Sequence, residues 1–149
     1  MKTKNKTLTS HQSAFAFVLC ILALPLSLSC QSYTTGLQKT RTRADETAII
    51  GTLRTIATAQ RAYSMSTGGD YGSFRQLTEN GFLDDRFGSE KPVVQDYVLT
   101  MTTEGKEFRC HADPANQQDG RHFYIDSTSL LIRVNPSAPA SASDPVYQP

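Results

Sequence analysis

Two histidines and a cysteine are the first residues in this chain that could do chemistry. Cys110 and His111 are adjacent, and a thiol beside an imidazole is the pairing that nucleophilic catalysis uses. Neighbouring residues of a strand point to opposite faces, however, so these two side chains are badly placed to share a proton or a metal. Free cysteines are often buried, and we expect Cys110 to be a core residue. His122 has no second ligand at metal-site spacing, so we expect it to be structural.

Oxygen ligands gather near the end of the predicted domain, at Asp113, Asn116, Asp119 and Asp126. Their spacing matches no calcium loop, and Asp and Asn are common in solvated turns. The chain also has no nucleophile elbow and no phosphate-binding loop. We therefore predict no catalytic residue, no metal and no cofactor, and a protein that is not an enzyme.

The beginning of the chain has the layout of an export signal. Three lysines lie within the first six residues, an apolar run covers residues 13–28, and Ser29-Cys30 follows. This run is shorter than the roughly 20 residues that span a bilayer comfortably. The pattern predicts a signal peptide over residues 1–29, and the rest of the chain is expected outside the cytoplasm.

The end of this signal, residues 26–30, resembles the lipidation motif of bacterial lipoproteins, with Ser27 and Leu28 transposed relative to the usual order. The resemblance implies cleavage just before Cys30 and a diacylglyceryl thioether on its sulfur. It also implies a lipid anchor in the cell envelope, on the outer membrane or facing the periplasm. Plain signal cleavage near Ser29 or Ser32 and an uncleaved signal anchor remain as alternatives.

Charge and cysteine usage exclude two classes of protein. Without its signal, the chain has twelve basic and fourteen acidic residues, a net charge of −2. It therefore lacks the basic field that supplies most nucleic-acid affinity, and no nucleic-acid partner is expected. With Cys30 lipidated, Cys110 is alone and cannot form an internal disulfide, so the chain is not expected to be a small disulfide scaffold.

Composition divides the rest of the chain into three parts. Residues 30–42 are polar and read as a tether. Residues 43–135 form one small domain, near the lower size limit for folding without staples. Residues 136–149 are rich in Pro, Ser and Ala, which predicts a disordered tail.

The domain begins with a predicted amphipathic helix. Asp45 and Glu46 suit a helix start, and the helix is expected to end before the run 66–70, whose paired glycines cannot sustain helical order. Apolar residues recur at helical spacing, with Gln60 among them. The predicted core face consists of Ile49, Leu53, Ile56 and Tyr63.

A short helix and a set of strands are predicted after it. Ser73 can cap a helix that runs to Glu79, and Asn80-Gly81 can stop it. Alternating patterns then predict strands over 97–102, 108–112, 121–125 and 130–134, with a hairpin turn at Glu104-Gly105. The predicted fold is α+β, with one long N-terminal amphipathic helix packed on a small antiparallel β-meander.

The domain resembles the globular part of type IV pilin-like and type II secretion pseudopilin-like proteins. Residues 44–56, with Gln60 and Tyr63, resemble the second half of that family's long helix, and residues 108–133 follow the order of its closing strands. The resemblance implies a pilin-like head. The chain departs from the family in having neither a prepilin-peptidase site nor the apolar half-helix of the filament core, so a lipid anchor takes that place.

Two functions from different classes follow. The first is a non-enzymatic, envelope-attached pilin-like or pseudopilin-like interaction protein, linked to secretion or surface-filament assembly and partnered by proteins of such an apparatus. The alternative is a periplasmic or surface ligand-binding lipoprotein with an unrelated α+β head.

Overall fold

The computed structural model describes residues 29–116 and 120–149, with side chains from Arg43 onward. Residues 1–28 of the predicted signal peptide and the side chain of Cys30 lie outside this part. The chain divides into two units, Met1–Thr40 and Arg41–Pro149, and the sheet belongs to the second. Within the described residues, no helix combines the length and the hydropathy needed to cross a bilayer.

Helix α2 (Ser29–Ser66) supplies one side of the core from Arg43 onward. The four residues of the predicted core face lie on the sheet side. Ile49, Leu53 and Ile56 are fully buried, and Tyr63 is half-buried with its ring edge-on to Phe82. The four-residue and three-residue steps between these positions keep them on one face of the helix, which explains why they share one environment.

Two short helices follow α2. Ser73 caps α3 (Phe74–Glu79): its hydroxyl accepts a hydrogen bond from the Gln76 N–H, while the Gln76 side chain accepts one from the Ser73 N–H. This reciprocal arrangement is a capping box, and it confirms the predicted helix start. Gly81 lies just beyond the helix with φ 75°, a conformation that glycine adopts without penalty. The 3₁₀ helix η2 (Asp85–Phe87) then returns Phe87 to the core.

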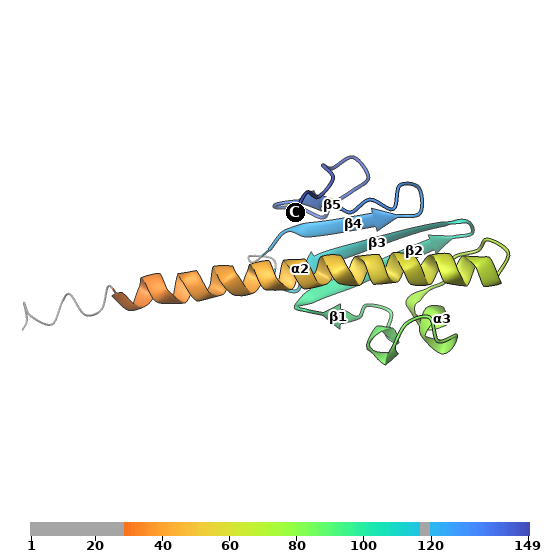
Figure 1. Cartoon of the computed structure of the whole chain (residues 1–149), viewed down its shortest axis with the longest axis horizontal. Coiled ribbons are helices and arrows are strands. Elements are labelled where there is room, and N and C mark those ends of the chain that lie inside the picture. The colour runs from red at the N-terminus through yellow and green to blue at the C-terminus, as the bar shows by residue number, and fades with distance from the viewer. Residues whose placement is uncertain (1–28, 117–119) are drawn as a thin grey trace, which may run out of the picture. The chain divides into compact units, whose positions relative to one another are not determined.

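Five antiparallel strands form a single sheet in which each strand pairs with the next along the chain. Figure 1 shows the part of α2 from Arg43 onward lying over this sheet, roughly along the strands β2, β3 and β4. The β2–β3 hairpin closes at Glu104 and Glu107, so its turn lies where the sequence predicts one. The strands are β1 (Val93–Val94), β2 (Tyr97–Glu104), β3 (Glu107–Pro114), β4 (His122–Asp126) and β5 (Arg133–Asn135).

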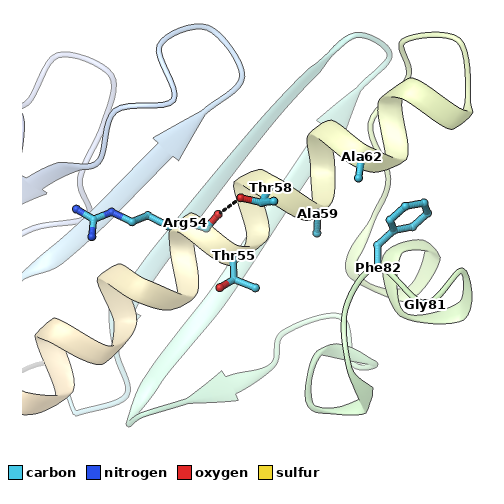
Figure 2. A pocket seen from close by; sticks show the side chains of 7 residues that line it. All are labelled: Arg54, Thr55, Thr58, Ala59, Ala62, Gly81 and Phe82. Atoms are coloured by element: carbon cyan, nitrogen blue, oxygen red, sulfur yellow. Dashed lines mark hydrogen bonds between the residues drawn. The ribbon is translucent and has the colours of Figure 1, made fainter.

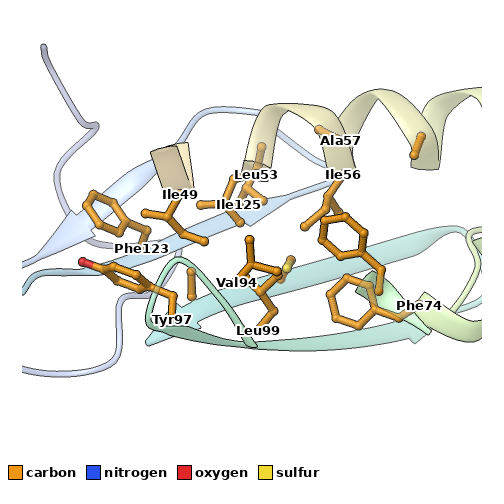
Figure 3. Close-up of a cluster of buried hydrophobic side chains, with 14 of the residues drawn as sticks. Ile49, Leu53, Ile56, Ala57, Phe74, Val94, Tyr97, Leu99, Phe123 and Ile125 are labelled. Carbon is orange, nitrogen blue, oxygen red and sulfur yellow. The ribbon is translucent and has the colours of Figure 1, made fainter. Parts of the chain in front are cut away.

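The core lies between α2 and one face of the sheet. Figure 3 shows helix residues such as Leu53 and Ile56 above strand residues such as Leu99 and Ile125. Phe74, from α3, closes one end of this cluster. Burial of these apolar side chains from both layers stabilises the domain, with no disulfide among the described residues.

A buried glutamine joins the helix to the loop before α3. The Gln60 side chain is fully buried; its Nε2 donates to the Gly72 carbonyl at 2.6 Å, and its Oε1 accepts from the Gly72 N–H at 3.0 Å. Nε2 also lies 3.0 Å from the Met101 sulfur. Because a buried amide without partners is costly, this two-way bond explains a polar residue on the apolar face.

The predicted fold class is wrong. The described domain is a five-stranded antiparallel sheet with one helix laid on it, and within this domain the helix covers only residues 43–66 of α2, so it is not the predicted long N-terminal helix. The predicted meander lacked β1, which has only two residues and therefore no alternation to detect. The last strand also begins later than predicted, at Arg133, because Asp126 caps a turn and Leu130 adopts φ 54° before it.

The segment after β5 also differs from the prediction. Residues 136–149 are not a disordered tail, since Ala140 is buried and Tyr147 packs against the core. Val146 pairs with Arg133 in an antiparallel bridge. The prediction from composition gave no weight to Tyr147, the one aromatic residue of this segment, whose packing orders it.

Candidate functional site

Cys110 lies on the core face of β3 and is fully buried. Burial, assisted by the nearby charge of Asp113, raises the pKa of the thiol to about 12. The thiolate is the nucleophilic form, so at neutral pH this cysteine is inert. His111, its neighbour, faces the other way and lies edge-on to the Tyr124 ring at 5.0 Å. The two residues do not form a site.

His122 and Asp113 form a pair on the outer face of the sheet. The His122 Nδ1 lies 2.6 Å from an Asp113 carboxylate oxygen, and the imidazole is buried. A carboxylate that orients an imidazole is part of a hydrolytic triad, but a nucleophile must complete it. Within the described part of the chain, His122 bonds to no hydroxyl or thiol through its side chain. The pair therefore joins β3 to β4.

The oxygen ligands of the sequence are not brought together as a set. Asp113 holds His122, while Asp126 caps the turn after β4, where its Oδ1 accepts the N–H groups of Thr128 and Ser129. Asp119 lies outside the described residues. Among residues 43–116 and 120–149, no group of three His, Cys, Asp or Glu side chains could hold a metal ion.

An ion pair that sequence reasoning missed joins α2 to Arg121, the residue just before β4. Glu46 accepts hydrogen bonds from the Arg121 guanidinium through both carboxylate oxygens, the shortest at 2.8 Å, and from the Arg121 N–H at 3.1 Å. The hydrogen bond and charge of Glu46 raise the pKa of Arg121. The guanidinium also lies over the rings of Phe123 and Tyr147. Only the acidic character of the helix start was visible in the sequence.

A shallow groove lies between the outer side of α2 and the loop that follows α3. Its volume is about 460 Å³. Figure 2 shows Ala59 and Ala62 of the helix on the side that faces the Phe82 ring. We call it the α2 groove, and it is lined by Arg54, Thr55, Thr58, Ala59, Ala62, Gly81 and Phe82.

The α2 groove is more apolar than its residue types suggest. The Thr58 hydroxyl donates to the Arg54 carbonyl at 2.9 Å, and the Thr55 hydroxyl donates to the Gly51 carbonyl at 3.1 Å. Since both hydroxyls are used within the helix, the methyl groups are what these threonines offer to a partner. The groove therefore presents small apolar groups beside one aromatic ring.

Charge along this side of the helix has one sign. Helix α2 carries no Asp or Glu between Thr47 and Ser66, but it carries Arg54 and Arg61. Neither guanidinium forms an ion pair with any residue that the structure describes. Met65 follows at helical spacing on the same face and is 86 % exposed, the highest value among the exposed large apolar side chains. Cations and apolar groups thus share one surface.

Part of this surface can be recognised in the sequence, because the predicted helix carries no acidic residue between Thr47 and Ser66. Phe82 and Gly81, which complete the groove, come from a loop, and their position depends on tertiary packing. No protein-family model, no curated protein and no solved structure matches the chain.

Proposed function

We propose that this protein is a non-enzymatic, envelope-attached interaction protein of the pilin-like or pseudopilin-like kind, linked to secretion or surface-filament assembly. Its anchor is a lipid on Cys30, and its binding surface is the α2 groove with Arg61 and Met65. The observation that carries the proposal is the groove itself, an exposed apolar surface beside two arginines without ion-pair partners in the described chain.

The side chains that could take part in catalysis have structural roles instead, and this supports a non-catalytic function. Cys110 is held as a thiol in the core, and His122 is held by Asp113 between two strands. Both therefore serve the fold. The groove, by contrast, contains no nucleophile that is activated by a neighbouring base.

The chemistry of the groove selects the kind of partner. Arg54 and Arg61 favour carboxylates, and Ala62, Met65 and Phe82 favour apolar side chains. The partner is therefore a protein segment that carries both acidic and apolar residues. A small ligand fits less well, because the helix side of the groove is exposed at Arg54, Thr55, Thr58 and Ala62 and does not enclose a molecule.

Site-specific crosslinking tests the surface. A photo-reactive residue at Ala62 in the full chain is expected to capture an envelope protein in a salt-sensitive product, because charge steers the contact. The product should be lost when Arg54 and Arg61 are both changed to Glu. The matched control is Thr102→Glu, which adds an acid to an exposed threonine on the opposite face of the sheet. A product that resists the arginine changes contradicts the proposed surface.

The anchor is tested separately. We expect Cys30→Ala to release the protein from the membrane fraction and to remove a lipid mass from the mature amino terminus. If the wild-type protein shows no lipid by mass spectrometry, the anchor is wrong, whatever the crosslinking result.

A further inference from the structure

The segment after β5 turns back and lies along that strand (Figure 1). The Val134 N–H donates to the Pro145 carbonyl at 3.0 Å, and the Tyr147 N–H donates to the Ile132 carbonyl at 2.8 Å. Between these two bonds, Arg133 and Val146 face each other in the antiparallel bridge. Residues 144–147, which we call the strap, thus extend the sheet beyond β5.

Side chains define what the edge of β5 accepts. The Tyr147 ring lies edge-on to Phe123 at 6.0 Å, and the Arg121 guanidinium lies 5.4 Å from the centre of the same ring. At the other end of the strap, Asp144 accepts from the Asn135 amide at 2.9 Å, and its carbonyl accepts from Arg133 at 2.8 Å. The edge therefore fits an extended segment with an acidic residue at one end and an aromatic residue three positions later.

The attachment of the strap to its own domain is short. One backbone hydrogen bond joins it to β5 and one joins it to Ile132 just before that strand, the Arg133 and Asn135 side chains each add a bond to Asp144, and residues 136–143 connect it to β5. Most of this connector is exposed, with Ala140 as its buried residue. The Nε atom of Arg133 is buried beside the strap without a hydrogen-bond partner. Since β5 is paired with β4 on its other side, the departure of the strap leaves the pairing of the five strands in place.

We propose that the edge of β5 is a strand-acceptor site, filled within one copy by its own strap, and that it also accepts the strap of a second copy. Exchange of an identical element preserves every contact and is a low-cost route to association. The connector, residues 136–143, keeps the strap at high effective concentration near β5 of its own copy. Exchange between copies is therefore expected where copies are crowded. This proposal does not depend on the α2 groove.

Paired cysteines test the exchange in the full chain. Arg133 and Val146 form a pair without mutual hydrogen bonds, a position where Cα atoms are about 4.5 Å apart and a disulfide fits. A tagged copy with Arg133→Cys is produced together with an untagged copy with Val146→Cys. We expect a disulfide-linked heterodimer on non-reducing gels, and its loss when Tyr147→Ala is added to the Val146→Cys copy.

Three controls decide the outcome. One copy with both cysteines must close an internal disulfide, and its failure overturns the assignment of the strap to β5. Thr102→Cys, produced with Val146→Cys, measures random collision from an exposed position on β2. Single variants measure the contribution of the chain's own cysteines. A heterodimer no stronger than the Thr102→Cys control, while the double variant closes internally, overturns exchange.

Discussion

Glu46 and Arg121, 75 positions apart in the chain, form an ion pair that ties the start of the packed helix to the start of β4. The Glu46 side chain is only 10 % exposed, and its two oxygens accept four hydrogen bonds from Arg121. The pair is therefore a long-range fastening between the two layers of the domain.

Loss of the Glu46 charge should destabilise the fold measurably. We expect Glu46→Gln to lower the free energy of unfolding by about 1–3 kcal/mol, since Arg121 then keeps a partly buried charge without its counterion. Urea denaturation measures this change. The exposed pair Arg109–Glu107 is the control, and Glu107→Gln should cost less than about 1 kcal/mol. Equal effects at the two sites would refute the assigned role.

Asp126 should contribute to stability in a pH-dependent way. Burial acts to raise its pKa, but hydrogen bonds from Ser129, Tyr124 and Thr128 outweigh burial, so the pKa of Asp126 in the folded protein lies below the ordinary value of 3.8. As the pH falls, Asp126 is protonated in the unfolded chain before it is protonated in the folded chain. The stability that Asp126 contributes is fully present above its unfolded pKa and is lost as the pH falls through its folded pKa.

The experiment on Asp126 is a series of urea denaturations between pH 7 and pH 2. Asp126→Asn should flatten the acid side of the stability profile. Asp85→Asn, at an exposed position in η2, is the matched control. An acid limb unchanged by Asp126→Asn, or flattened as much by Asp85→Asn, contradicts the assignment.

Cys110 should report on unfolding. Because burial holds its pKa at about 12, the thiol is expected to resist alkylation at pH 8 in the folded protein and to react once urea unfolds the chain. Peptide mapping by mass spectrometry separates it from the other cysteines. The raised pKa also predicts a loss of stability as pH rises above the unfolded value near 9. Rapid labelling of native Cys110 would show that the core is open there.

Two glycines should respond to alanine in opposite directions. A methyl group at Gly51 meets nothing within 4 Å, so Gly51→Ala should stabilise the exposed side of α2 by about 0.5–1 kcal/mol. A methyl group at Gly72 would lie 2.9 Å from the Tyr63 ring, so Gly72→Ala should destabilise. Thermal melts of both variants measure the contrast. Stabilisation by Gly72→Ala would mean that the ring moves aside freely.

Sequence patterns predicted those elements whose signal is local. The core positions from Ile49 to Ile56 repeat at helical spacing, and Ser73 with Gln76 encodes a helix start within four residues. The two-residue strand β1 gave no such pattern. The turn between β1 and β2 places Gln95 and Asp96 at positive φ, a conformation that the pair of residue types does not predict.

Long-range contacts explain the rest of what the sequence concealed. Tyr147 is ordered by Phe123 and Arg121, residues far back in the chain, so the composition of residues 136–149 pointed the wrong way. The α2 groove is completed by Phe82, which comes from a loop, and the Glu46 ion pair forms only when the sheet brings Arg121 next to the helix. Each depends on how layers meet, which no short window of sequence contains.

The two borders of the sheet have a consequence for solubility. On one side the border strand is β1, two residues long, and on the other the strap covers β5. Open main-chain edges are the templates on which fibrous aggregates grow. Wherever copies of the domain come close together, the strap has to leave β5 before a neighbouring chain can stack onto that border, and this requirement slows fibrous growth there.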